Sequence, residues 1–400
     1  TFNVGPGSSS VWLHLGTFGP RRVDFPDAVH PVPPPHGLVD NAHSLLDVTD
    51  LVFIDPVGTG FSRAVGEAKA QEFQGVTEDV RAVAEFIRRW TTENGRGNSP
   101  KYLAGESYGS TRAAALVDHL QDAEGMFFNG VMLVSSILNF GTARFDPGND
   151  LPYITFLPTY AATAWYHGRV QPRPELEPFL AEVRHFAETE YAQALMLGAR
   201  LPADREQAVA RQLAAYTGLS VDFIRRANLR VSIGRFTKEL LRDQRRSVGR
   251  LDSRYLGIDA DAAGETYSHD PSYTAILGPY TAALNHYVRQ ELKFEDERKY
   301  EILSGEVNRR WNWGAANGGS FLNVGENLRR AMSKNPHLRV HVANGYYDLA
   351  TPFFATEYTF DHLGLEPHLR GNVSMSYYEA GHMMYSHPES LAKLRRELVR

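Results

Sequence analysis

Residues 105–109 read Gly-Glu-Ser-Tyr-Gly, which is the pattern G-x-S-x-G. This pattern is typical of a serine on a sharp turn between a strand and a helix, where small residues on each side relieve crowding. A serine hydroxyl is a weak nucleophile at neutral pH, so it needs a general base that a carboxylate holds in place. Ser107 is therefore the candidate nucleophile for acyl transfer. The alternative is an inert serine in a glycine-flanked turn.

Two later residues could supply the base and the acid. Asp348 follows a predicted strand at 338–342, and His382 follows a second predicted strand at 373–378. Both would lie on loops just past the carboxyl ends of strands, where the active sites of parallel α/β sheets assemble. Alone, each residue is more often structural. In the chain order serine, acid, histidine, which accompanies G-x-S-x-G, they predict a catalytic triad with Ser107.

A glycine-rich stretch at residues 3–10, Asn-Val-Gly-Pro-Gly-Ser-Ser-Ser, could serve the same reaction. A tetrahedral oxyanion needs preorganised N–H donors, and glycine lets the backbone approach it closely. We expect the backbone N–H groups of Gly5 and Tyr108 to form the oxyanion hole. The alternative is a loop without a catalytic role.

The elements that would position these residues alternate along the first third of the chain. Apolar runs at 51–54, 101–104 and 131–134 are typical of buried strands. The spacing of apolar residues over 76–90 and 112–121 predicts helices between them. This order indicates an α/β fold with a mostly parallel sheet and helices on both faces.

The middle of the chain, residues 151–330, has a mostly helical pattern and few strand runs. Strands then return, together with helices predicted at 353–363 and 388–399. We therefore divide the chain into a first part of the sheet domain (1–150), a helical cap over the Ser107 end of the sheet, and a second part of the sheet domain (331–400).

Composition excludes several classes of protein. The net charge of −5 argues against a strongly basic nucleic-acid binder, and no apolar run approaches the roughly 18 residues of a membrane span. The absence of cysteine excludes disulfides and thiol nucleophiles. The 15 histidines show no H-E-x-x-H, and no dinucleotide fingerprint or phosphate loop appears, so we expect neither a metal nor a cofactor.

Four segments together resemble the serine carboxypeptidases, and residues 344–348 fit the resemblance as well. They are residues 3–10, 52–62 (Val-Phe-Ile-Asp-Pro-Val-Gly-Thr-Gly-Phe-Ser), 105–109 and 381–385 (Gly-His-Met-Met-Tyr). The resemblance covers nearly the whole chain apart from a variable helical insert, and the lack of cysteine suits bacterial members. It implies an α/β-hydrolase fold and a serine-type carboxypeptidase in the periplasm or outside the cell. Its substrates would be peptides with a free C-terminus.

The resemblance also implies how the substrate is recognised. In the family, the asparagine of the glycine-rich motif and the glutamate before the nucleophile bind the substrate's terminal carboxylate. These positions are Asn3 and Glu106 in this sequence. An ionised glutamate would repel a carboxylate, so Glu106 must carry a proton and donate it. We therefore expect activity to be favoured at acidic pH.

This sequence departs from the family pattern at three places. Val4 stands where the family has glycine, and a β-branched residue is strained there if the position needs positive φ. Thr17 stands where many members carry a second glutamate, so that glutamate pair with Glu106 is missing. Only Thr1 and Phe2 of the central strand before the motif are present, so we expect the sheet to lack its first strands.

Two other functions stay open. An esterase or acyltransferase could use the same scaffold and triad, and Asn3 and Glu106 favour a substrate with a carboxylate without excluding this option. A non-catalytic binding protein would keep only the pocket. Val4 is the one feature that favours it, and an intact triad argues against it. No motif indicates the side-chain preference or the oligomeric state.

Overall fold

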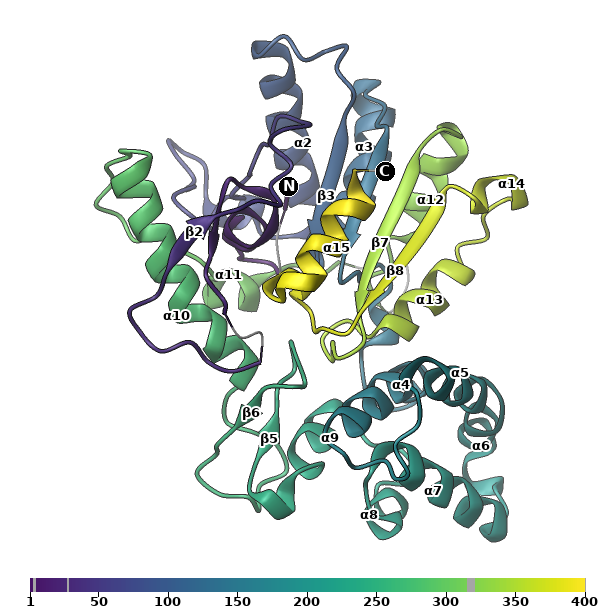
Figure 1. The fold of residues 1–400 in the computed structure, drawn as a ribbon. Helices are drawn as coiled ribbons and strands as arrows, with labels where there is room; N and C mark the ends of the chain where they lie inside the picture. Colours follow the sequence, from purple (N-terminus) through teal and green to yellow (C-terminus); the bar gives the residue numbers. More distant parts are fainter. Residues whose placement is uncertain (3–4, 27–28, 315–320, 400) are drawn as a thin grey trace.

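A four-stranded parallel sheet forms the centre of the computed structural model, which describes residues 1–2, 5–26, 29–314 and 321–399 (Figure 1). The strands run in the order β3-β4-β7-β8, and all three pairings are parallel. Their bounds are β3 (Tyr102–Glu106), β4 (Gly130–Val134), β7 (Arg339–Gly345) and β8 (Val373–Tyr378). Because the strands are parallel, their carboxyl ends all lie at one edge of the sheet.

Helices cover both faces of this sheet. They are α2 (Val76–Glu93), α3 (Tyr108–Glu124) and α12 (Gly325–Lys334) on one face, and α10 (Pro271–His286) and α15 (Pro388–Leu398) on the other. The first group packs in one hydrophobic cluster with Leu103 and Val131, and the second packs in another with Ala104 and Val134. Neighbouring residues of a strand face opposite sides, so the strands pack against helices on both faces of the sheet. The predicted parallel sheet with helices on both faces is confirmed.

The middle of the chain builds a helical block. Its helices are α4 (Leu151–Tyr166), α5 (Leu176–Phe186), α6 (Ala192–Leu197), α7 (Ala203–Thr217), α8 (Val221–Arg226) and α9 (Ile233–Glu239). They share one hydrophobic cluster and lie beyond the edge of the sheet towards which the strands point (Figure 1). An antiparallel pair, β5 (Ser247–Val248) and β6 (Leu256–Gly257), follows them. Since α10 and α12 pack on the sheet instead, the cap boundaries 151–330 stay a prediction.

Shorter elements complete the fold. They are α1 (Val11–Leu13), η1 (His14–Phe18), β1 (Arg21–Val23), β2 (Leu38–Asp40), α11 (Gly305–Arg310), α13 (Phe353–Asp361), α14 (Pro367–Arg370) and η9 (Met384–Ser386). Over the described ranges, we find no helix that combines the length and the apolar character needed to cross a membrane.

The first residues lie along the outer side of β3. Phe2 forms a parallel bridge with Gly105, and its N–H donates to the Ala104 carbonyl oxygen at 2.9 Å. Residues 51–54 come next, and the Ile54 N–H donates to the carbonyl oxygen of Thr1 at 3.4 Å. The strand predicted at 51–54 is wrong, because Thr1 is its only neighbour for backbone pairing among the described residues and no ladder forms.

A buried ion pair fastens α2 to α3, the helix that begins directly after Ser107. Arg112 Nε donates to Asp79 Oδ2 at 2.6 Å, and the two side chains are only 1% and 3% exposed. The guanidinium also lies over the rings of Phe2 and Tyr108, at 5.5 and 5.4 Å from the ring centres. The start of α3 is therefore fixed from two sides.

Replacing Asp79 with alanine should destabilise the protein strongly. The substitution leaves the Arg112 charge buried without its partner, which typically costs about 3–5 kcal/mol. Urea unfolding followed by circular dichroism measures the loss. Glu85→Ala on the same helix is the matched control, because Glu85 is exposed and pairs with Arg88 and Arg89 on the surface. That variant should stay within about 0.5 kcal/mol of wild type. Equal losses in both variants would contradict the interpretation.

Candidate active site

Ser107 occupies the strained turn that the sequence pattern predicts. Its backbone has φ 56° and ψ −124°, between the last residue of β3 and the first residue of α3. A side chain on Gly105 would overlap the carbonyl group of Gly109, so only glycine fits before the turn. The Ser107 N–H donates to the Val134 carbonyl oxygen at 2.9 Å, which ties the turn to the end of β4.

Asp348 and His382 lie together on the loops after β7 and β8. His382 Nδ1 is 2.8 Å from Asp348 Oδ2, and both side chains are fully buried. The other carboxylate oxygen accepts the N–H groups of Ala350 and Thr351 at 2.8 and 3.0 Å. The Thr351 hydroxyl donates to Oδ2 at 2.7 Å. Because an ionised carboxylate only accepts hydrogen bonds, the imidazole must present its N–H at Nδ1.

The second ring nitrogen of His382, Nε2, takes no part in the contact with Asp348. Nε2 is buried and has no hydrogen-bond partner among the residues that the structure describes. Ser135, directly after β4, brings the loops together. Its hydroxyl donates to the His382 carbonyl oxygen at 2.6 Å, and its N–H donates to the Ala343 carbonyl oxygen at 2.9 Å. Its neighbour Val134 accepts the Ser107 N–H, so one short segment connects the serine turn with β7 and with the loop of His382.

Several charges act on His382. Burial alone lowers its pKa, but the charge and hydrogen bond of Asp348 and the charge of Glu106 outweigh burial and the opposing charge of Arg250. The pKa of His382 therefore lies above its ordinary value of 6.5. A neighbouring anion has this effect because it favours the imidazolium over the neutral ring.

Glu106 is the last residue of β3 and is fully buried. The hydroxyl of Tyr385 lies 2.9 Å from each of its carboxylate oxygens and donates to them. Of the other predicted residues, Gly5 has φ 68°, which suits glycine, and Tyr108 begins α3. Asn3 and Val4 lie outside the described residues.

A segment from the middle of the chain bonds the loops of this site, and no sequence pattern predicted it. The residues from Arg250 to Arg254, which we call the strap, lie between β5 and β6. The Leu349 N–H donates to the Arg250 carbonyl oxygen at 3.0 Å, and the His382 N–H donates to that of Leu251 at 2.6 Å. The strap therefore holds both loops that carry the predicted acid and base.

Asp252 strengthens this attachment. Its Oδ2 accepts the N–H of Gly381 at 3.1 Å and the guanidinium of Arg254 at 2.7 Å. Arg254 in turn donates to the carbonyl oxygen of Glu379 at 2.9 Å. The only sequence signal for this pair is an aspartate and an arginine two residues apart, which any polar loop can show.

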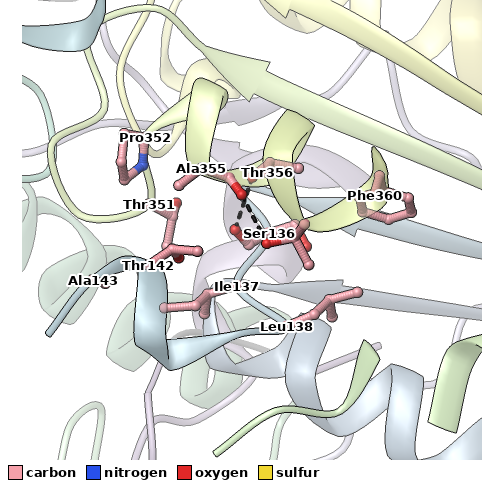
Figure 2. A pocket seen from close by; sticks show the side chains of 11 residues that line it. Ser136, Ile137, Leu138, Thr142, Ala143, Thr351, Pro352, Ala355, Thr356 and Phe360 are labelled. Atoms are coloured by element: carbon pink, nitrogen blue, oxygen red, sulfur yellow. Dashed lines mark hydrogen bonds between the residues drawn. The ribbon is translucent and has the colours of Figure 1, made fainter. Parts of the chain in front are cut away.

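A small cavity lies behind the loop that carries Asp348. Its volume is about 10 Å³, and it lies among Ser136, Thr142, Thr351 and Thr356 (Figure 2). The hydroxyl of Thr356 donates to the Ser136 carbonyl oxygen at 3.1 Å. A space of this size holds about one water molecule, so it is too small for a substrate side chain. Within the described ranges, no three His, Asp or Glu side chains are arranged to hold a metal ion.

Comparisons with known proteins indicate similarity to one family. Residues 2–171 match the sequence model of the serine carboxypeptidase family. Serine-type carboxypeptidase F of Aspergillus niger is 36% identical over 107 residues, 26% of this chain and 18% of that protein. Serine carboxypeptidase-like 11 of Arabidopsis thaliana is 28% identical over 153 residues, 37% of this chain and 34% of that protein. Over residues 2–171 the chain is similar to the serine carboxypeptidases.

These matches span only 18% and 34% of the length of the two curated relatives. A solved structure extends the likeness. The prohormone-processing carboxypeptidase Kex1 from Saccharomyces cerevisiae has a TM-score of 0.57 with 15% identity, covering 99% of this chain and 81% of that one. At this identity the likeness concerns the fold, and it confirms the predicted α/β-hydrolase fold.

Replacing Asp252 with asparagine should slow the chemistry at Ser107. An amide has one acceptor oxygen and no charge, so it cannot accept at both positions where the Asp252 carboxylate bonds Arg254 and Gly381 (Oδ1 and Oδ2), and the His382 loop loses part of its support. We expect labelling of Ser107 by a fluorophosphonate probe to slow by about 10- to 100-fold, the usual effect of a displaced catalytic group. Labelling rates, measured by mass spectrometry at several probe concentrations, test this.

Asp259→Asn is the matched control. Asp259 forms another ion pair of the middle region with low exposure, to Lys238 at 2.5 Å, and its other side-chain partner is Ser268. That variant should lose stability and label at the wild-type rate. Unchanged labelling of Asp252→Asn would show that the strap does not position His382.

Proposed function

We propose that the protein is a serine-type carboxypeptidase, which releases C-terminal residues from peptides through a Ser107–His382–Asp348 acyl-enzyme mechanism. The observation that carries this proposal is the buried pair of His382 and Asp348. The Nε2 atom of His382 has no partner among the described residues, and its loop is tied to the serine turn. Kinship with the serine carboxypeptidases supports it, and on kinship alone we propose that the enzyme works outside the cytoplasm.

The residues divide the chemistry as follows. His382 accepts the hydroxyl proton of Ser107 at Nε2 while the serine oxygen attacks the scissile carbonyl. The N–H groups of Gly5 and Tyr108 stabilise the oxyanion of the tetrahedral intermediate. The imidazolium then passes the proton to the leaving amine, which departs as the released amino acid. Water, deprotonated by the same nitrogen, cleaves the acyl-enzyme and restores Ser107. Asp348 holds the imidazole in the required tautomer throughout.

Glu106 and Asn3 would make the enzyme an exopeptidase. Glu106 directly precedes the nucleophile and is buried, so the terminal carboxylate of a bound peptide would meet it at short range. Two negative charges cannot share a small buried site cheaply, so the productive complex contains protonated Glu106. Protonation of Glu106 also removes one of the anions that favour imidazolium at His382. Protonation of the acid that binds the substrate thereby favours the neutral form of the base.

The pH dependence follows from these two groups. His382 must be neutral to act, so activity falls as the pH drops through its pKa. That pKa is raised above 6.5 in the free protein, partly by the charge of Glu106. For peptides, activity also falls at higher pH as Glu106 ionises, whereas an ester without a free carboxylate has no such limit.

The substitution Glu106→Gln separates the two effects. Glutamine keeps a donor and cannot ionise, so the alkaline limb of kcat/KM for a blocked dipeptide should flatten. Ester hydrolysis should persist, and its acid limb should move to lower pH because His382 loses a neighbouring anion. Profiles of kcat/KM against pH for a peptide and its matching ester measure both.

Ser107→Ala is the control, and it should abolish both activities. An unchanged peptide profile for Glu106→Gln would contradict the carboxylate-recognition role. Equal cleavage of C-terminally amidated and free peptides would contradict it as well, and an esterase or acyltransferase would then be the better description.

A further inference from the structure

Tyr385 lies on η9, three residues after His382, and touches the predicted substrate-recognition acid directly. Its hydroxyl donates to the two carboxylate oxygens of Glu106, at 2.9 Å each. Glu106 is completely buried, and Tyr385 is 1% exposed. Bulk water therefore does not compete for this contact, and a hydrogen bond to a charged group is strong under such conditions.

The ring of Tyr385 has little freedom to move away. It packs against Gly16 in η1, where any side chain would overlap the ring. Tyr280 of α10 also packs against Gly16. A side-chain carbon at position 16 would lie only 2.7 Å from the Tyr280 hydroxyl oxygen. Glycine at position 16 thus makes room for two buried phenols beside Glu106.

The charged and titratable groups that act with Glu106 come from several elements. Among the described residues they include Tyr385 on η9, Tyr280 on α10 and His382 on the loop after β8. Burial, followed by the charge of Glu106, raises the pKa of both tyrosines well above the ordinary value of 10.0. Both phenols therefore keep their protons over the whole working range, and Tyr385 can always donate.

We propose that Tyr385 is a positioning residue for Glu106. Through this contact, Tyr385 sets the upper pH limit at which the enzyme recognises a substrate carboxylate. This inference rests on the proposed function. A donor favours the ionised carboxylate, so Tyr385 makes Glu106 lose its proton at lower pH. When Glu106 is protonated, Tyr385 donates to the carbonyl oxygen of the Glu106 carboxyl group. The O–H of Glu106 is then left to donate to the substrate carboxylate. One phenol therefore limits the pH range and orients the group that binds peptide.

The substitution Tyr385→Phe tests this in the full chain. It removes one oxygen atom and keeps the ring. We expect the alkaline limb of kcat/KM for a blocked dipeptide with a free carboxylate to move up by about one pH unit or more, since a hydrogen bond to a charged group is lost. KM for the peptide should rise at low pH because Glu106 is less well oriented. The matching methyl ester should keep its alkaline profile.

Tyr280→Phe is the matched control. The Tyr280 hydroxyl is equally buried, but it has no hydrogen-bond partner in the part of the chain that the structure describes. Its removal should leave the alkaline limb for the peptide in place. A shift of equal size in this variant would mean that the limb responds to any lost phenol, and the inference would be overturned.

The double variant Glu106→Gln/Tyr385→Phe supplies a second measurement, since an effect that acts through Glu106 must vanish when Glu106 cannot ionise. Its peptide profile should equal that of Glu106→Gln. If Tyr385→Phe leaves the limb unmoved while Glu106→Gln flattens it, the inference is wrong and the proposed function stands. If Glu106→Gln also leaves the profile unchanged, the carboxylate-recognition role and the inference are both wrong.

Discussion

The turn at Ser107 is the constraint on which the rest of the site depends. A non-glycine residue with φ 56° costs about 1–3 kcal/mol, and it persists only where the surroundings determine it. Here Val134 holds its N–H, and glycine at position 105 lets the chain pass close to Gly109. The buried Asp79–Arg112 pair then fixes the helix that leaves the turn. Sheet and helix together keep the serine side chain at the edge where the strands end.

Around this turn, the site is organised by charged groups that are buried away from bulk water. Asp348 accepts hydrogen bonds at both oxygens, which fixes its plane and therefore the orientation of the His382 ring. The charge of Glu106 also raises the pKa of the same imidazole. Asp348, His382 and Glu106 cannot titrate independently in such a space, so their pH dependence belongs to the group as a whole.

The sequence predicted those parts of the molecule that depend on local pattern. The apolar run at 131–134 lies within β4, because a strand buried on both faces needs such a run, and the segment at 373–378 forms β8. The run at 51–54 is equally apolar and is no strand, since a strand also needs a paired neighbour. The strap and the contact between Tyr385 and Glu106 join residues 99 or more positions apart. Such contacts depend on how the cap and η9 fold, and no short-range pattern records them.

The strap also decides how the cap and the chemistry are linked. Its hydrogen bonds to Leu349 and His382 use backbone groups, which are independent of side-chain identity. Asp252 is the exception, because its carboxylate joins Gly381 to Arg254. A change that moves the strap acts on both loops at once, because its backbone bonds Leu349 and His382. The middle of the chain is thus part of the support of the loops that carry Asp348 and His382.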